Sequence, residues 1–147
     1  MSDSPPDPAR TAEPSADGFV ETEPEIARAR LRSEAIGILG LEGGAGRPPE
    51  LRPVNYAVYR SWIVMRTDRG LLFDAAREHT PASLAVTAVD PETRTAWSVI
   101  VKGRLEVGDA GSDGAQLASW AHSGKTERIR LSIDEISGRH LLERPRD

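Results

Sequence analysis

Two neighbouring segments carry polar side chains where a purely structural hairpin would be apolar. Asn55 stands within Pro53-Val54-Asn55-Tyr56, and Arg66-Thr67 ends an apolar run shortly before Gly70. A guanidinium, a hydroxyl and free backbone N–H groups beside a glycine turn are groups that bind phosphate. These residues therefore indicate a site for a phosphate-bearing cofactor on the wall of a β-barrel.

The elements that must position this site are strands. Period-two alternation and turn residues predict seven of them: 35–41, 51–58, 62–67, 83–89, 95–107, 128–133 and 136–142. A capping box at Thr22 to Glu25 predicts a helix from Thr22 to Ser33, and further short helices are expected over 71–78 and 115–122. Because about six strands follow one another with only short helices between them, the pattern favours a mainly β fold, a six-stranded antiparallel barrel.

Alternation also assigns side chains to faces. Within 62–67, Trp62, Val64 and Arg66 share one face, whereas Ile63, Met65 and Thr67 share the other. Within 95–107, Trp97 lies on the face opposite to Ser98 and Lys102. Trp97 taken alone is a typical core residue, and Arg66 taken alone is a common surface arginine. Lys102 in the middle of an apolar strand would require a partner, as at a barrel or dimer seam.

The N-terminal segment differs in composition from the rest. The first 25 residues contain seven acidic side chains, one arginine and five of the eleven prolines. We therefore expect a disordered acidic tail over residues 1–22 and one folded domain over residues 23–147. Taking the −6 of those 25 residues from the −4 of the whole chain leaves about +2, which does not support nucleic-acid binding.

Several kinds of site are excluded or poorly supported. The chain has no cysteine, so thiolate catalysis and cysteine-bound metals are excluded. Its three histidines lack metal-ligand spacing, and Ser119 replaces the first glycine of a phosphate-binding loop that would end at Lys125-Thr126. No residue is an evident catalytic acid, base or nucleophile. No apolar run is long enough to span a membrane, and with no targeting segment we expect a cytoplasmic protein.

Four stretches in order resemble the pyridoxamine 5'-phosphate oxidase-like family of flavin-binding split barrels, in particular its small actinobacterial members. They are 52–56, 65–67 with Gly70, 96–104, and 128–130 leading to 136–139. The resemblance covers residues 25 to 142. It implies a six-stranded split barrel that forms a homodimer, with flavin mononucleotide (FMN) held in clefts at the dimer seam.

The resemblance also implies roles for individual residues. The FMN phosphate would be held by Arg66 and Thr67, and the ring would lie along the strand Pro53, Val54, Asn55 and Tyr56. Trp97 and Ser98 would belong to the neighbouring wall. The implied activity is that of an oxidoreductase, with hydride passing between the flavin and a small-molecule substrate. Some similar proteins use a deazaflavin coenzyme instead.

Two positions depart from the family pattern. Ile38 stands where similar proteins have arginine, and Leu72 stands where they have a phosphate-binding lysine. Loss of one charge-assisted contact would weaken binding about ten- to a hundredfold, unless Arg69, Arg77 or the start of the 71–78 helix offsets it. Two alternatives therefore stay open: a protein that binds flavin, deazaflavin or haem without catalysis, and a barrel that has lost its cofactor.

Overall fold

Strands make up most of the part of the chain that the structure describes. The computed structural model describes residues 18–108 and 127–142. The expected helix over 115–122 lies outside these residues. The elements are β1 (Phe19–Thr22), α1 (Pro24–Ser33), β2 (Ile36–Leu41), β3 (Glu50–Tyr59), β4 (Trp62–Thr67), α2 (Leu71–Arg77), β5 (Pro81–Asp90), β6 (Thr95–Val107), β7 (Glu127–Ser132) and β8 (Glu135–Leu141).

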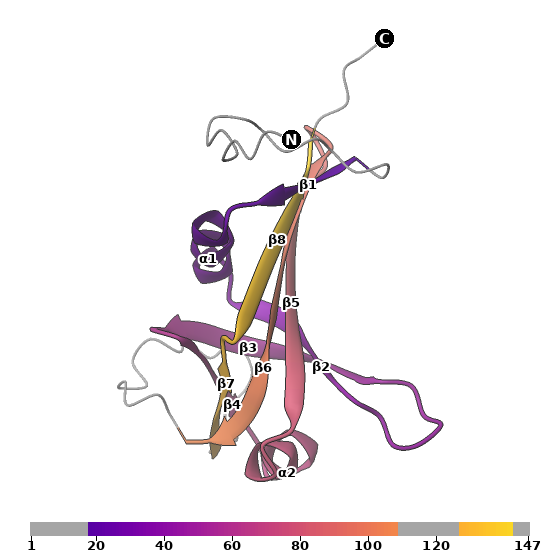
Figure 1. Cartoon of the computed structure of the whole chain (residues 1–147), viewed down its shortest axis with the longest axis vertical. Coiled ribbons are helices and arrows are strands. Elements are labelled where there is room, and N and C mark those ends of the chain that lie inside the picture. The colour runs from indigo at the N-terminus through magenta and orange to yellow at the C-terminus, as the bar shows by residue number, and fades with distance from the viewer. Residues whose placement is uncertain (1–17, 109–126, 143–147) are drawn as a thin grey trace, which may run out of the picture.

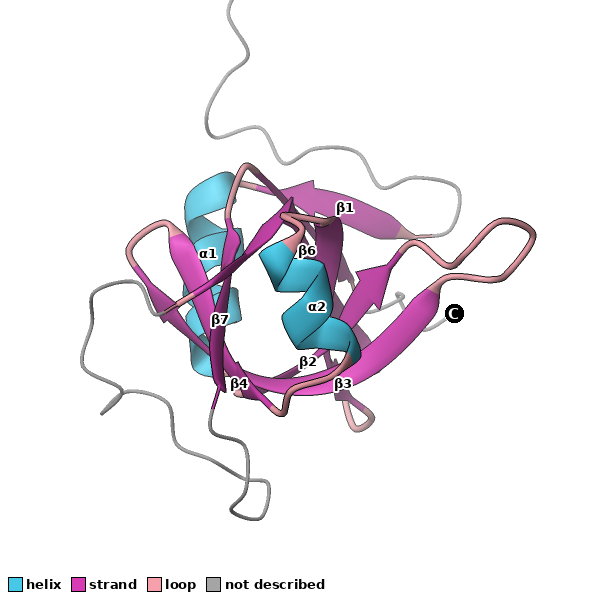
Figure 2. Ribbon diagram, turned by 90° about the horizontal axis from the view of Figure 1, so that it is seen from below, coloured by secondary structure: helices cyan, strands magenta, loops and turns pink. Residues whose placement is uncertain are grey.

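Six of the strands close into an antiparallel barrel in the order β6-β5-β2-β3-β4-β7, with β7 pairing back to β6 (Figures 1 and 2). The barrel closes because β6 is long enough to pair with a strand in each of two sheets. Its residues 95–104 pair with β5, and its last three residues, 105–107, pair with β7. The predicted mainly β fold with a six-stranded antiparallel barrel is confirmed.

The change of sheet along β6 takes place at Gly103. A Cβ atom at this position would collide with the backbone carbonyl oxygen of Ser132 at the end of β7. The absent side chain therefore lets β6 pass close to β7, which is the close backbone approach that glycine permits in a strand. Gly103 therefore lies next to the point where the barrel closes.

Beyond the barrel, β8 pairs with the first half of β6, and β1 pairs with β8 (Figure 1). Helix α1 packs against β8 and buries Ala27 and Leu31. The sequence analysis placed Phe19–Thr22 in the tail, whereas in the structure these residues form β1. The predicted capping box is wrong, because Thr22 ends β1 and Glu23 is the N-cap residue, without a side-chain cap hydrogen bond.

The core lies inside the barrel and under α1. Ile63 on β4, Val99 on β6 and Leu131 on β7 point inward and are all fully buried. Helix α2 lies across one end of the barrel (Figure 2), where Leu72 and Phe73 pack against the core. Within the described ranges, neither helix is long and apolar enough to cross a membrane.

Candidate functional site

The proposed ligand strand β3 presents its site residues on two opposite faces. Val54 and Tyr56 point inward and are buried, whereas Pro53 is exposed and Asn55 half-buried on the outer face. Only the side chains of Pro53 and Asn55 can therefore contact a ligand lying on the outer face. Val54 and Tyr56 can contribute backbone groups there.

The same alternation separates Arg66 from Thr67. Arg66 is half-buried on the outer face of β4, and Thr67 is buried on the inner face. Tyr56 and Met65 are the last paired residues of β3 and β4, and Asn55 and Arg66 are the next residues beyond this pair. Pro53, Asn55 and Arg66 therefore share the outer face of these two neighbouring strands.

A second guanidinium lies next to this group. Strand β7 pairs with β4 so that Arg128 is directly opposite Arg66, and both side chains are on the outer face. The sequence analysis included Arg128 in a matching stretch but gave it no role. Only the long-range pairing of β4 with β7 could have identified it, because 61 residues separate the two arginines along the chain and residues 109–126 fall within that interval.

Trp97 and Ser98 on β6 lie farther away. Trp97 packs against the core, with the guanidinium of Arg30 5.8 Å from its ring centroid. Ser98 is on the outer face, but β5 and β2 separate its strand from β3. Three strand spacings amount to roughly 14 Å. The structure therefore does not bring Ser98 or Trp97 into the group formed by Pro53, Asn55 and Arg66.

Hydrogen bonds join the middle of β3 to the last turn of α1 and to Ala35, which follows that helix. The side-chain amide of Asn55 donates to the carbonyl oxygen of Ala35 at 2.9 Å, and the Tyr56 hydroxyl donates to that of Leu31 at 2.5 Å. Burial of the phenol raises the pKa of Tyr56 above its usual range, and the nearby carboxylate of Glu34 raises it further. Tyr56 is therefore a neutral structural donor at neutral pH.

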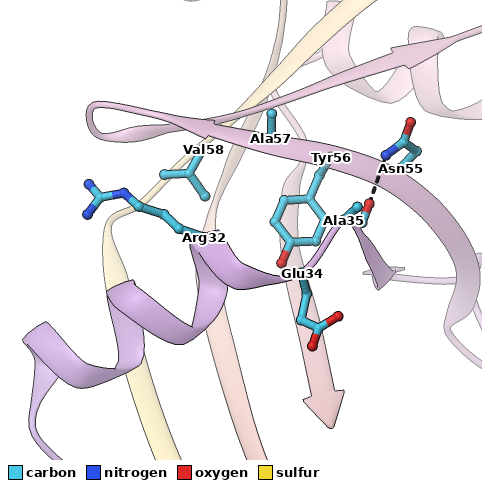
Figure 3. A pocket seen from close by; sticks show the side chains of 7 residues that line it. All are labelled: Arg32, Glu34, Ala35, Asn55, Tyr56, Ala57 and Val58. Carbon is cyan, nitrogen blue, oxygen red and sulfur yellow. Dashed lines mark hydrogen bonds between the residues drawn. The ribbon is translucent and has the colours of Figure 1, made fainter. Parts of the chain in front are cut away.

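A pocket of about 270 Å³ opens where β3 passes the end of α1 (Figure 3). Asn55 and Ala57 point to one side of β3, whereas Tyr56 and Val58 point toward α1. The pocket is lined by Arg32, Glu34, Ala35, Asn55, Tyr56, Ala57 and Val58. Arg32 contributes a cation and Glu34 a carboxylate. The pocket and the outer-face group therefore share Asn55.

The pocket also reaches an edge of β3 that carries no strand. Strand β2 pairs with β3 only from Glu50 to Asn55, so residues 56–59 have no strand neighbour on that side in the described part of the chain. The backbone N–H of Tyr56 already donates to the carbonyl oxygen of Ala35 at 2.9 Å. Beyond Tyr56, backbone groups at such an edge can bind a ligand with its own donors and acceptors.

Apolar side chains continue the outer face across β2. Ile36 and Ile38 are each 41% exposed, and Ile38 is directly opposite Pro53 on β3 and Ala85 on β5. The neighbouring residue Gly37 points inward, where a Cβ atom would lie 2.9 Å from a methyl carbon of Leu84. Ile38 therefore supplies an exposed apolar surface in the position where similar proteins have arginine.

The other expected compensating groups are engaged or lie elsewhere. The guanidinium of Arg69 is 3.1 Å from the carboxylate of Glu127. Leu72, in the first turn of α2, packs against the core. Arg77 is exposed in the last turn of α2. Lys102 is exposed on the outer face of β6 in the single chain, opposite Glu135 on β8. No group of three metal-binding side chains occurs in residues 18–108 and 127–142.

The family is established by the sequence itself. The model of the family described as pyridoxamine 5'-phosphate oxidase matches residues 23–140, which is most of the chain. The chain therefore belongs to this family. No curated protein matches.

Solved structures support the same fold. An FAD-binding protein from Mycobacterium smegmatis superposes with a TM-score of 0.68 at 24% identity, covering 83% of this chain and 99% of that one. An FAD-binding protein from Mesorhizobium loti gives 0.68 at 19% identity, covering 83% and 96%. An FAD- and haem-binding protein from Mycobacterium smegmatis gives 0.61 at 18%, covering 88% and 76%. At these identities the likeness shows the fold.

Proposed function

We propose that this chain binds a flavin nucleotide on the outer face of β3 and β4 and acts as an oxidoreductase on a small molecule. The observation that carries the proposal is that Asn55 and Arg66 share one face just beyond the last paired residues of β3 and β4, at the border of the apolar surface formed by Ile38 and Pro53. A flavin nucleotide has a phosphate, a polar pyrimidine edge and a flat apolar ring. The three environments match these three parts.

Each residue would act on a different part of the cofactor. Arg66 would neutralise the phosphate, with Thr67 supporting the strand end from the inner face. Asn55 and the backbone of Pro53 to Tyr56 would orient the pyrimidine edge. The bound flavin supplies the hydride chemistry, and the protein supplies orientation and charge neutralisation.

The proposal includes a homodimer. Ile36 and Ile38 expose apolar side chains on a sheet face that surrounds Pro53. Contiguous exposed apolar surface of this kind is typical of protein interfaces, and a second copy of the chain would cover it. The flavin ring would then lie in the seam between the two subunits.

The pocket beside Asn55 is the proposed entry for the substrate. It adjoins the outer-face group, and its volume of about 270 Å³ suits a small molecule rather than a second nucleotide. Arg32 and Glu34 give it one charge of each sign. A substrate held there would lie next to the strand along which the flavin ring is placed.

The identity of the nucleotide is a separate question. The family resemblance favours FMN, whereas all three structural neighbours named above are described as binding FAD, one of them together with haem. A deazaflavin coenzyme would use the same phosphate anchor. Release of the ligand by heat, followed by its identification by mass, distinguishes these three.

One observation supports a second candidate function, binding without turnover. The outer-face group contains an amide, a guanidinium and apolar side chains, and none of these is a general acid or base at neutral pH. Reduction of the bound flavin followed by reoxidation with added acceptors tests this point. Reoxidation that is no faster than that of free flavin favours a storage protein.

The site itself is tested by titration with FMN. We expect Arg66→Gln to weaken binding about ten- to a hundredfold, because it removes a charge-assisted contact to phosphate. Arg47→Gln, in the exposed β2–β3 loop, is the matched control and should leave the affinity unchanged. Equal affinities of the wild type and Arg66→Gln for FMN would refute this placement of the phosphate.

A further inference from the structure

Strand β3 continues past the end of its neighbour β2. The register of the two strands ends at Asn55, and the Tyr56 N–H then donates to the carbonyl oxygen of Ala35. The chain before Ala35 forms α1, whereas β3 stays paired with β4 as far as Tyr59. In the part of the chain that the structure describes, residues 57–59 therefore have an open strand edge beside the pocket.

The backbone groups of Val58 point to this open edge. Along a strand, the N–H and C=O groups of successive residues point to opposite edges. The hydrogen bond from Tyr56 to Ala35 shows that the Tyr56 backbone faces α1, and Val58, two residues further on, faces the same side. Val58 thus offers one donor and one acceptor, spaced for the main chain of another extended segment.

Two charged side chains flank these backbone groups. Arg32 lies in the last turn of α1 and Glu34 is the C-cap residue, and both are exposed and line the pocket. Neither side chain forms an ion pair within the described residues. In Figure 3, Arg32 lies on the side of Val58 and Glu34 lies beside the ring of Tyr56. The pocket therefore has a cation at one end and a carboxylate at the other.

The size and spacing of these groups favour a short peptide as the ligand. Two residues of a strand, such as Tyr56 to Val58, span roughly 7 Å. A free amino acid carries its ammonium and carboxylate on one carbon atom, so it cannot extend over this distance, and it has no amide to pair with Val58. An extended peptide of a few residues has both the amide groups and the separated terminal charges. The volume of about 270 Å³ excludes a much longer one.

We propose that this pocket binds a short zwitterionic peptide, extended along the open edge of β3. Its ammonium group pairs with Glu34, its main chain bonds to Val58, and its carboxylate pairs with Arg32. Because Glu34 lies by Tyr56 and Arg32 by Val58, the peptide runs parallel to β3. The assignment of such a peptide as the substrate rests on the proposed function, whereas its binding does not.

The experiment measures binding of trialanine and of free alanine to the full-length chain by calorimetry. We expect trialanine to bind more tightly than alanine. Arg32→Gln and Glu34→Gln should each weaken binding of trialanine about two- to fivefold, which is the size of an exposed ion pair. The matched controls are Arg47→Gln and Glu42→Gln, two exposed residues outside the pocket, and they should bind trialanine like the wild type.

Blocked peptides assign each charge to its partner. Acetyl-trialanine has no ammonium group, so its affinity should fall in Arg32→Gln and be unchanged in Glu34→Gln. Trialanine amide has no carboxylate and should show the reverse. The opposite pattern, or equal losses of both blocked peptides in both variants, overturns the proposed orientation of the ligand.

Methylation of the ligand tests the pairing with Val58 without changing the protein. In the parallel arrangement, the N–H of the third alanine donates to the Val58 carbonyl oxygen, whereas the N–H of the second points away. We expect N-methylation of the third residue to weaken binding about two- to tenfold and N-methylation of the second to have no effect. Equal affinities of the two methylated peptides overturn the pairing with the strand edge.

The titrations are run with and without FMN, which separates this proposal from the flavin function. Trialanine binding with the expected pattern in a chain that binds no flavin supports the peptide pocket and refutes the flavin proposal. Flavin binding without any binding of trialanine to the wild type refutes the peptide pocket alone.

Discussion

The Tyr56 hydroxyl donates a 2.5 Å hydrogen bond to the carbonyl oxygen of Leu31, which joins the middle of β3 to the last turns of α1. Both residues are buried, at 2% and 0% exposure. We predict that Tyr56→Phe lowers the free energy of unfolding by about 1–2 kcal/mol, because it leaves a buried carbonyl oxygen without its donor. Urea denaturation measures the change. Tyr59→Phe, at the half-buried end of β3, is the control and should cost less.

The same tyrosine predicts a pH dependence of stability. Burial raises the pKa of Tyr56 in the folded state above the value of about 10 expected for the unfolded chain. The folded protein then holds its phenolic proton where the unfolded chain has lost it, so the stability due to Tyr56 is complete below about pH 10 and declines above it. The wild type should lose stability more steeply than Tyr56→Phe between about pH 10 and pH 11. Parallel curves would show that Tyr56 does not titrate as proposed.

Closure of the barrel depends on Gly103. We predict that Gly103→Ala destabilises the protein by about 1–3 kcal/mol or more, since the added methyl group meets a backbone oxygen of Ser132 that cannot rotate away. Gly44→Ala provides the control, because its added Cβ would touch only the flexible side chain of Arg47 at 3.8 Å. Thermal denaturation of both variants checks the prediction. Similar melting temperatures would mean that β6 and β7 separate at little cost.

The exposed residue Ile38 tests the proposed dimer. We predict that Ile38→Lys raises the dimer dissociation constant about tenfold or more, because association would bury an unpaired ammonium in each subunit. Leu71→Lys is the matched control, since Leu71 is 45% exposed on α2, away from the sheet face that holds Ile38. Analytical ultracentrifugation over a range of concentrations gives both constants. A monomeric wild type, or a dimer that Ile38→Lys leaves intact, would contradict the proposed seam.

Much of the barrel could be predicted from sequence because its strands have strong local patterns. The bounds of β4 and β6 agree with the structure, and alternation gave the correct buried face of β7. Strand β1 was missed because its four residues follow an acidic, proline-rich segment and pair with β8, more than 100 residues away. Helix α1 begins at Pro24 rather than Thr22 because Thr22 belongs to that strand.

The candidate site was harder to predict for a related reason. Adjacent residues of a strand point to opposite faces, so pairs such as Arg66-Thr67 cannot both present side chains to one ligand. The outer-face residues nearest to one another in the register, Asn55, Arg66 and Arg128, come from three strands. Local sequence shows each strand but not the register between β4 and β7.

The most direct test of the central claim is an absorption spectrum of the purified chain after incubation with excess FMN or FAD and removal of the free ligand. The proposed outer-face site predicts a bound flavin spectrum close to one equivalent per chain for at least one of the two nucleotides, and a strongly reduced amount in Arg66→Gln. A colourless protein with both nucleotides would contradict flavin binding.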